Sequence, residues 1–367
     1  VEKVCKDSDL VKSTSRPTID SKQPDPWKNH EQLNILLLGG DSGHGRDEDW
    51  GVRMDTIMVA SLDTKTGDTT IVQIPRNVQY TPFPEGTEMH ELFPDGFRGE
   101  GTSDNWYVNN IWDMVDQDEY PEVLEGQTYR GAEALKQGAE GITGLRIDYF
   151  VMLNIDGIQR LIDSMGGVTV NINERLPRGG DSMGRQPNGY LDPGPDQHLN
   201  GYDAMWYARS RSSTDDYSRM ARQSCLIDAI INQASPQRML VSYEAIAAAS
   251  ADMVITDIPQ DVLEPMVELA WDVKSANVER LVFAPGKNGY EYANPDFDAM
   301  RNAVEDAVES SSSTPSATPD ATQTESQPQS PDATEEDPES PDEDPDASPT
   351  FAEGPQTVAD ACGYDPE

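Results

Sequence analysis

The sequence predicts an α/β fold, with a central mixed sheet between layers of helices and a disordered acidic tail at the C-terminus. Short apolar runs such as Leu33–Leu38 alternate with segments of helical periodicity such as Thr128–Gly141, which is typical of a layered α/β/α domain. From Ser311 to Glu367 the chain has fifteen Asp or Glu, ten Pro and no Lys or Arg, a composition that cannot bury a core. We therefore divide the 367 residues into an extension at 1–32, a folded domain at 33–310 and a tail at 311–367.

Six strands are expected from short runs rich in apolar and β-branched residues. The first, LNILLL, stops at Gly39 and Gly40 and has the continuous apolar character of a strand buried on both faces. A turn at Asp63–Asp68 separates the second strand from the third. The expected strands are Leu33–Leu38, Thr56–Leu62, Thr69–Pro75, Asp148–Asn154, Val168–Ile172 and Arg280–Phe283.

Helices are expected where apolar residues recur at helical spacing between turn residues. We expect Asp156 to cap the helix that ends at Gly166 and Gly167. Residues 77–127 and 173–196 are rich in Gly and Pro and are predicted to be loops, and residues 1–32 a polar linker. The expected helices are a short one near Asn105–Val115, then Thr128–Gly141, Asp156–Met165, Leu199–Tyr207 and Asp296–Glu309.

The formal net charge of -40 argues against a nucleic-acid partner, because phosphate backbones require a broad basic face. A local basic pocket in such an acidic protein suits a small phosphorylated ligand. The four histidines are scattered, and the three cysteines form no CxxC motif, so the sequence predicts no zinc site. The cysteines are either free buried thiols or partners in a long-range disulfide.

The arginines cluster in one stretch, Met205–Gln223, which contains no lysine. Arginine presents a planar fork of donors that fits phosphate through paired bonds. Arg209 and Arg211 are two residues apart and would share one side of an extended segment, whereas Arg219, Arg222 and Gln223 would share one helix face. A salt-bridged surface helix is the simpler interpretation, but four arginines at these spacings favour a phosphate site at a helix N-terminus, with Asp215, Asp216 and Ser218 as possible caps.

Charged residues also follow the predicted strands. Asp41 follows the first strand and Arg76 the third. In open α/β sheets the binding crevice lies at the carboxyl ends of the strands, so we expect the site there.

Five segments, in this order, resemble the LytR-CpsA-Psr family of cell-envelope phosphotransferases, in particular its actinobacterial members. They are LLLGGDSGHGR (36–46), RMDTIMVASLD (53–63) leading into IVQIPRN (71–77), SMGGVTVNI (164–172) and LNGYDAMWYARSR (199–211), followed by DDYSRMARQ (215–223). Each motif is weak alone, but the ordered set is specific and the resemblance spans residues 33–309.

The resemblance implies that a glycan polymer, with its proximal phosphate, is moved from a polyprenyl-pyrophosphate lipid to a hydroxyl of peptidoglycan or of a cell-wall protein. It also implies a place on the extracytoplasmic face of the cytoplasmic membrane. The chain begins at Val1 and contains no apolar run of about 20 residues that could span a bilayer, so we expect a membrane anchor upstream of it.

The same resemblance assigns roles to individual residues. Asp41 and Asp55 match carboxylates that would hold Mg²⁺, or Mn²⁺ in its place. Arg53 and Arg76 match arginines of the catalytic motifs, and Asp216 matches an aspartate that would act as general base or as a helix cap. The pyrophosphate clamp would consist of Arg209, Arg211, Arg219, Arg222 and Gln223.

The chain departs from the family pattern at three positions. Gly43, Asn77 and Tyr107 stand where the family has arginine, aspartate and lysine, and only Arg46 could replace the arginine. These changes concern the geometry of the phosphate site or the acceptor rather than the reaction class. The lipid would need an apolar slot, which residues of the ordinary core could line: 149–152, Ile155, Ile158, Leu161, Ile162, Met165, Ile227, Ile230 and Ile231.

Two other functions fit parts of the sequence. The segment GDSGH around Ser42 is similar to the nucleophile motif of a serine hydrolase, although the many short strands of that protease barrel are missing. A non-catalytic binder of polyprenyl phosphate or phosphoglycan would tolerate the three departures. Labelling of Ser42 by a fluorophosphonate, or binding of the lipid without turnover, would identify these alternatives.

The resemblance also bears on the cysteines. Actinobacterial members often have cysteines near the positions of Cys225 and Cys362, which favours this pair over a disulfide from Cys5 to either residue. Such a bond would tie the less biased end of the tail, Thr357–Tyr364, to the helix that carries half of the arginines.

Overall fold

The computed structural model describes residues 17, 19–40, 53–116, 120–180, 186–210, 216–233, 254–313, 354–357 and 362–365. The strands are β1 (Gln32–Gly40), β2 (Met54–Asp63), β3 (Thr69–Ile74), β4 (Tyr149–Asn154), β5 (Val168–Ile172), β6 (Leu176–Arg178), β7 (Gly189–Leu191), β8 (Gly194–Leu199), β9 (Val254–Thr256), β10 (Val278–Val282) and β11 (Gln356–Thr357). The α-helices are α1 (Glu88–Leu92), α2 (Ile111–Asp116), α3 (Arg130–Thr143), α4 (Ile155–Met165), α5 (Gly201–Arg209), α6 (Asp216–Gln233), α8 (Leu263–Ser275) and α9 (Phe297–Ser313), and 3-10 turns lie at Ser103–Trp106, Val108–Asn110 and Gln260–Val262.

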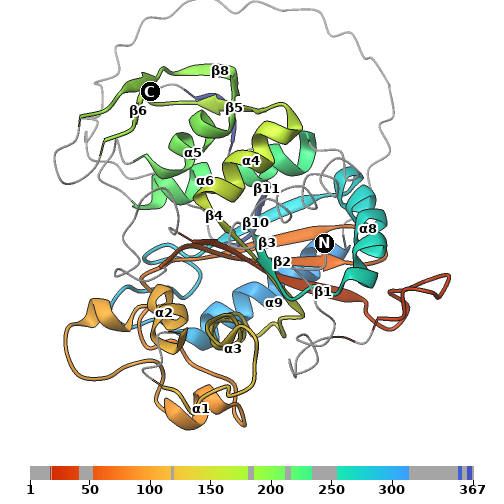
Figure 1. Ribbon diagram of the computed structural model, residues 1–367, viewed down its shortest axis with the longest axis vertical. Helices are drawn as coiled ribbons and strands as arrows, with labels where there is room; N and C mark the ends of the chain where they lie inside the picture. Colours follow the sequence, from red (N-terminus) through yellow and green to blue (C-terminus); the bar gives the residue numbers. More distant parts are fainter. Residues whose placement is uncertain are drawn as a thin grey trace, which may run out of the picture.

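The centre of the molecule is a mixed sheet of seven strands in the order β11-β10-β3-β2-β1-β4-β9 (Figure 1). β1 runs parallel to β4, and β3 runs parallel to β10. The remaining neighbours are antiparallel, including the β1–β2 pair and the β2–β3 pair that the predicted turn at Asp63–Asp68 joins. The sheet therefore confirms the mixed α/β architecture that the alternation of strands and helices predicts.

Helices cover both faces of this sheet, which gives the expected layers (Figure 1). On one face, α2, α3 and α9 bury the largest apolar cluster, to which β1 contributes Leu36 and Leu38 and β3 contributes Val72 and Ile74. On the other face, α4, α5 and α6 form a second layer with the two-stranded sheets β5–β8 and β6–β7. Their own apolar cluster includes Ile162, Leu176 and Leu226, so this layer has a core separate from that of the sheet.

Two loop predictions are corrected by the structure. The segment 173–196 contains β6, β7 and the start of β8, short strands that the Gly and Pro content concealed. The segment 77–127 holds α1 and two 3-10 turns besides α2. The cap of α4 is Asn154, whose Oδ1 accepts from the Gly157 amide at 2.8 Å, and not Asp156, which lies in the first turn.

The N-terminal extension is part of the body from residue 19 onward. Ile19 and Trp27 are buried in a cluster with Leu33, Tyr149 and Leu269 of α8. These two side chains are isolated among polar residues, so no periodicity indicated their burial. Across the described ranges, no helix combines the length and the apolar composition needed to cross a membrane.

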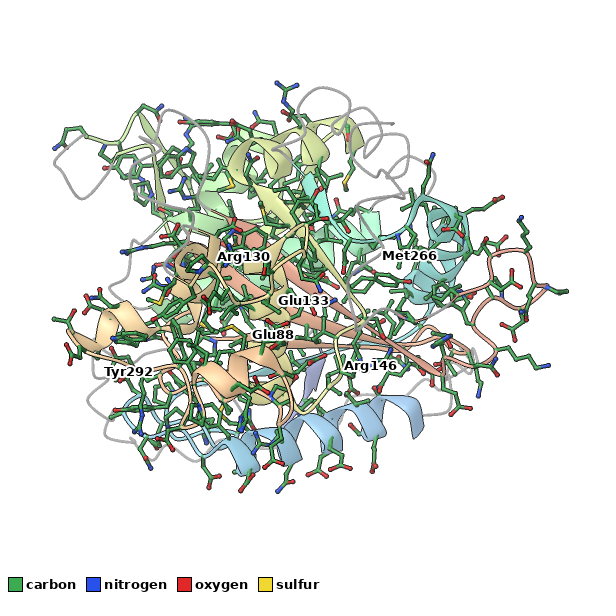
Figure 2. The ribbon with its side chains drawn as sticks, turned by 60° about the horizontal axis from the view of Figure 1, so that its bottom comes forward. Glu88, Arg130, Glu133, Arg146, Met266 and Tyr292 are labelled. Carbon is green, nitrogen blue, oxygen red and sulfur yellow. A yellow bond between two sulfur atoms is a disulfide. The ribbon has the colours of Figure 1, made fainter. Side chains whose placement is uncertain are left out.

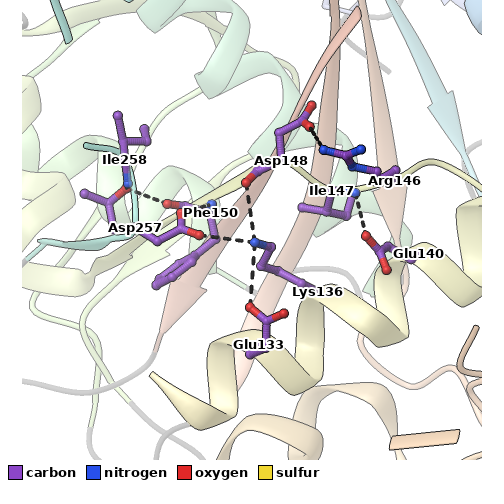
Figure 3. A network of polar contacts seen from close by, with 10 residues as sticks. Glu133, Lys136, Glu140, Arg146, Ile147, Asp148, Phe150, Asp257 and Ile258 are labelled. Carbon is purple, nitrogen blue, oxygen red and sulfur yellow. Dashed lines mark hydrogen bonds and ion pairs between the residues drawn. The ribbon is translucent and has the colours of Figure 1, made fainter. Parts of the chain in front are cut away.

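A buried polar network joins α3 to the ends of β4 and β9 (Figure 3). Lys136 of α3 lies 3.1 Å from Asp257 and 3.8 Å from Glu133, and donates to the backbone oxygen of Asp148 at 3.4 Å. The second carboxylate oxygen of Asp257 accepts from the Phe150 amide at 2.7 Å. The network thus fixes a helix to two strands at the edge of the sheet where β4 begins.

The end of the chain returns to the folded body. β11 adds to the edge of β10, and Cys362 forms a disulfide with Cys225 of α6. Asn171 of β5 donates to the Cys362 carbonyl oxygen at 2.9 Å, and Asn173 accepts from the Asp365 amide at 3.2 Å. The docking expected for Thr357–Tyr364 is present. The tail is predicted to be disordered from residue 311, but α9 continues to Ser313 and β11 begins at Gln356, while residues 314–353 lie outside the described residues.

Candidate functional site

The ends of four strands lie together at one end of the central sheet, which we call the sheet edge of the site. Gly40, the last residue of β1, is paired with Met54 at the start of β2 and with Asn154 at the end of β4. β3 ends on the same side, because Ile74 is paired with Ile57 of β2. Arg76, which follows β3, and Asp55, near the start of β2, are therefore brought to the same end of the sheet, where α/β sheets carry their binding crevice.

Asp55 and Arg76 form an ion pair at this edge. Arg76 Nη1 donates to Asp55 Oδ1 at 2.8 Å, and the side chains are 25% and 33% exposed. The pair joins the start of β2 to the residue after Pro75 at the end of β3. Both side chains reach solvent, so together they offer a guanidinium for phosphate oxygens and a carboxylate beside it.

Arg53 lies one residue before β2 and is exposed. Its positive charge contributes to holding the pKa of Asp104 below the usual range, although the main cause is the hydrogen bond from Thr102. The loop that carries Asp104 therefore lies near the edge where Asp55 and Arg76 meet.

Helix α6 is attached to the sheet through Gln73 of β3. Gln73 Nε2 donates to the Met220 carbonyl oxygen at 3.0 Å, and its Oε1 accepts from Ser224 Oγ at 2.8 Å. Sequence reasoning missed Gln73, whose only signal was a single amide side chain inside an apolar run. The contact holds the turn of α6 that carries Arg219 over the strand that leads to Arg76.

Arg222 braces the second layer. Its Nε donates to the Tyr207 carbonyl oxygen at 2.9 Å, Nη2 to the Ser210 carbonyl oxygen, and Nη1 lies 2.6 Å from Glu174 Oε1. Burial lowers the pKa of this guanidinium, and the Glu174 carboxylate opposes that shift. Arg222 thus fixes the end of α5, where Arg209 is located.

The other clamp residues lie on the same two helices. Arg219 and Gln223 are buried on α6. Arg209 is the last residue of α5, with its guanidinium 5.8 Å from the Trp206 ring centroid, so it is helical rather than in the extended segment expected. Its predicted partner Arg211 lies outside the described residues.

A further buried arginine, Arg280 of β10, was also missed. Nε and Nη1 of Arg280 have no hydrogen-bond partner among the residues that the structure describes. Burial lowers the pKa of its guanidinium, whereas Asp228 of α6 and Tyr207 of α5 oppose the shift. Burial also raises the pKa of Tyr207 to about 12. An arginine in the strand VERLV gave no local signal of this packing.

Several predicted residues cannot be compared with the structure. Asp41, Ser42, Gly43 and Arg46 lie outside the described residues, as does the side chain of Asp216. The described ranges contain no group of three or more His, Cys, Asp or Glu that could hold a metal ion. The metal pair of Asp41 and Asp55 therefore stays a prediction, with Asp55 at the expected edge.

The two remaining departures from the motifs, Asn77 and Tyr107, lie next to this edge. The Tyr290 hydroxyl donates to Asn77 Oδ1 at 3.4 Å, and the Tyr107 and Tyr292 hydroxyls share a hydrogen bond. Asn109 donates its amide to the Arg76 carbonyl oxygen at 3.2 Å, so the segment after Tyr107 is attached directly to Arg76.

Apolar side chains lie between β4 and α4. Val151, Leu153 and Met165 are only partly buried around Leu161 and Val254. Other residues of the predicted lipid slot, such as Ile162, contribute to the core of the second layer. The half-buried group begins one residue from Asn154, at the edge that carries Asp55 and Arg76.

Comparisons with known proteins identify the family and the fold of the chain. The model of the LytR_cpsA_psr family matches residues 3–309. The chain is 27% identical over 256 residues to a Halalkalibacterium halodurans protein named polyisoprenyl-teichoic acid–peptidoglycan teichoic acid transferase TagU, a match covering 68% of this chain and 69% of that protein. Among solved structures it resembles the Streptococcus agalactiae protein gbs0355 (TM-score 0.55, 19% identity, 78% and 91% of the two chains). Bacillus subtilis TagV is similar at a TM-score of 0.52, with 20% identity over 78% and 99%.

Proposed function

The chain belongs to the LytR-CpsA-Psr family, and we propose that it transfers a glycan polymer from a polyprenyl-pyrophosphate carrier to a hydroxyl of peptidoglycan or of a cell-wall protein. The relative from Halalkalibacterium halodurans is named for such a transfer of teichoic acid to peptidoglycan. Both the nature of the transferred glycan and the acceptor that receives it are proposed here.

One observation carries the proposal: the Arg76–Asp55 pair lies at the edge where β1, β2, β3 and β4 meet, below a helix layer that contains Arg209, Arg219 and Arg222. Cleavage of a pyrophosphate concentrates negative charge on the phosphate oxygens, so fixed cations accelerate it. Because the protein is already strongly acidic, this local cluster of arginines is not needed to keep it soluble.

The proposed step exchanges one phosphorus–oxygen bond for another. The acceptor oxygen bonds to the proximal phosphorus while the bond from that phosphorus to the bridging oxygen breaks. Polyprenyl phosphate leaves, and the glycan keeps the proximal phosphate. The hydroxyl proton passes to solvent water, and Asp216, at the first position of the arginine-bearing helix α6, takes the role of helix cap rather than base.

Magnesium belongs to the proposal as well. Asp55 fits such an ion in donor type, because it places carboxylate oxygen at a polar edge that solvent reaches. Asp41 would add a second carboxylate immediately after Gly40. A bound divalent ion would neutralise phosphate charge during the transfer. The half-buried apolar group around Leu161 is our candidate for the lipid slot, and it would set the enzyme against the outer face of the membrane.

The test uses a fluorescent polyprenyl-pyrophosphate glycan and isolated peptidoglycan. We expect release of polyprenyl phosphate together with label in the peptidoglycan, and loss of both after chelation with restoration by Mg²⁺. Tight binding of the lipid without release would instead identify the chain as a binder. Release that persists in full in Asp55→Ala would show that the metal site is misplaced.

A further inference from the structure

Two tyrosines from distant parts of the chain, Tyr107 and Tyr292, form a pair beside the candidate site. The rings of Tyr107 and Tyr292 are 6.3 Å apart at an interplanar angle of 67°, and their hydroxyls are hydrogen-bonded. Tyr292 remains 43% exposed. Figure 2 shows it toward one end of the molecule, far from Met266 of α8.

The pair stands on backbone that is tied to Arg76. The Val108 amide donates to the Val78 carbonyl oxygen at 3.0 Å, which fixes Tyr107 next to the segment that follows β3. The carbonyl oxygen of Tyr292 accepts from Gln79 Nε2 at 3.3 Å. Both rings are therefore positioned by residues that lie within three positions of Arg76.

The tyrosines and the arginine helices lie on opposite sides of the sheet edge. Trp106, Val108 and Tyr290 pack in the cluster beneath α3 and α9, which places the pair on that face. α6 is bound to the other face through Gln73. A phosphate at Arg76 would thus have arginines on one side and tyrosines on the other.

Phosphoryl transfer requires the attacking and leaving oxygens to be roughly in line through phosphorus. The leaving polyprenyl phosphate belongs with the arginines and with the apolar residues between β4 and α4. The acceptor must then approach from the opposite side, where Tyr292 is exposed and Tyr107 is half-buried. The face of the sheet on which Tyr107 and Tyr292 lie therefore belongs to the acceptor rather than to the lipid-linked donor.

We propose that Tyr107 and Tyr292 form an acceptor subsite that stacks against a pyranose ring of peptidoglycan. The proposal rests on the proposed function and adds the position of the acceptor. The faces of an aromatic ring carry negative charge density, and the axial C–H groups of a pyranose are weakly positive, so the two surfaces attract.

The experiment measures transfer of the labelled glycan to a soluble peptidoglycan fragment, with KM determined separately for fragment and lipid. Tyr292→Ala should raise the KM for the fragment about tenfold, the loss of about 1.4 kcal/mol of stacking, and leave the KM for the lipid unchanged. Tyr292→Phe keeps the ring and loses the hydroxyl bond to Tyr107, so it should behave like the parent. Tyr190→Ala, at a tyrosine of β7 that is 45% exposed, is the matched control.

Equal losses in Tyr292→Ala and Tyr292→Phe would overturn the proposal, since the hydroxyl bond would then be a structural clasp between two loops. An unchanged KM for the fragment in Tyr292→Ala would overturn it too. The proposed function fails in a different way, because the parent would then release no polyprenyl phosphate. Release of polyprenyl phosphate by the parent with an unchanged fragment KM in Tyr292→Ala contradicts the subsite alone.

Discussion

The two ends of the central sheet both contain an ion pair, but the pairs differ in burial. Lys136 and Asp257, where β4 begins, are 1% and 4% exposed (Figure 3). Arg76 and Asp55, at the opposite end of the sheet, where β3 ends and β2 begins, are 25% and 33% exposed. The buried pair also has protein groups around it, namely Glu133, the Asp148 carbonyl oxygen and the Phe150 amide.

This difference shows that burial of charge alone does not locate a functional site. A buried charge must be compensated within the protein, and the Lys136 network uses its groups to hold α3, β4 and β9 together. The Arg76–Asp55 pair keeps contact with solvent, where a ligand can exchange for water. We therefore infer that the Lys136 network stabilises the fold, whereas the Arg76–Asp55 pair takes part in the chemistry. Substitutions that break each ion pair test this inference.

The largest effect is expected for Lys136→Met. The substitution leaves the Asp257 and Glu133 carboxylates buried without their cation, so the free energy of unfolding should fall by about 3–5 kcal/mol. Urea unfolding followed by circular dichroism measures this. Lys65→Met, which removes an exposed pair with Glu31, should leave the midpoint unchanged. A Lys136→Met protein with the same urea midpoint as the parent would refute the structural role of Lys136.

Arg76→Lys should show the reverse pattern. The charge is kept, but the planar fork that binds Asp55 and phosphate together is lost, so we expect turnover of the lipid to fall about 100-fold. The urea midpoint should stay near that of the parent. Arg98→Lys, which makes the same substitution at an exposed ion pair with Asp95, serves as the control. Full activity in Arg76→Lys would indicate charge steering in place of paired bonding.

Arg222→Lys should combine the two effects at smaller size. It removes donors to the Tyr207 and Ser210 carbonyl oxygens, which should lower the free energy of unfolding by about 2 kcal/mol. Turnover should fall about tenfold through displacement of the end of α5, a smaller loss than for Arg76→Lys. If Arg222 bound pyrophosphate directly, turnover would fall while the urea midpoint stayed constant.

The smallest effect concerns pH. Burial raises the pKa of Asp148 above its ordinary value of 3.8, and burial likewise raises the pKa of Glu140. The folded state therefore binds these protons more readily than the unfolded state. Their contribution to stability is present at low pH and is lost as pH rises through the raised pKa values.

Asp148→Asn removes one of these carboxylates while keeping an oxygen that can accept from the Asn34 amide. The melting temperature of the variant should exceed that of the parent at pH 7, and the difference should vanish near pH 4 and below. Thermal melts from pH 4 to pH 8 measure it. A variant that is less stable than the parent by the same amount at every pH would contradict this account.

Six strands, β1 to β5 and β10, were predictable because burial on a sheet leaves short apolar runs between turns, and the ordered motifs indicated Asp55 and Arg76. The Cys225–Cys362 disulfide, which the resemblance favoured, is also present. These features have signals that are local in sequence or repeated across a family. Asn154, by contrast, competed with Asp156 two residues later for the same cap, and only the backbone geometry distinguishes them.

Contacts between distant segments could not be predicted. Gln73 reaches Met220 across 147 residues, and Tyr107 reaches Tyr292 across 185. Each of these residues has an ordinary local sequence, and its role depends on how the sheet aligns the segments. The N-terminal residues Ile19 and Trp27 show the same limit, because a single apolar residue among polar neighbours carries no periodicity.

The disulfide also makes part of the chain a closed covalent ring. Cys225 and Cys362 are separated by 137 residues, and β9, α8, β10 and α9 all lie inside that interval. One cut by an extracellular protease within the acidic segment would open the ring without releasing a fragment. The nicked protein would migrate as one species until a reductant was added, and it would keep the end of the chain attached to α6 in the meantime.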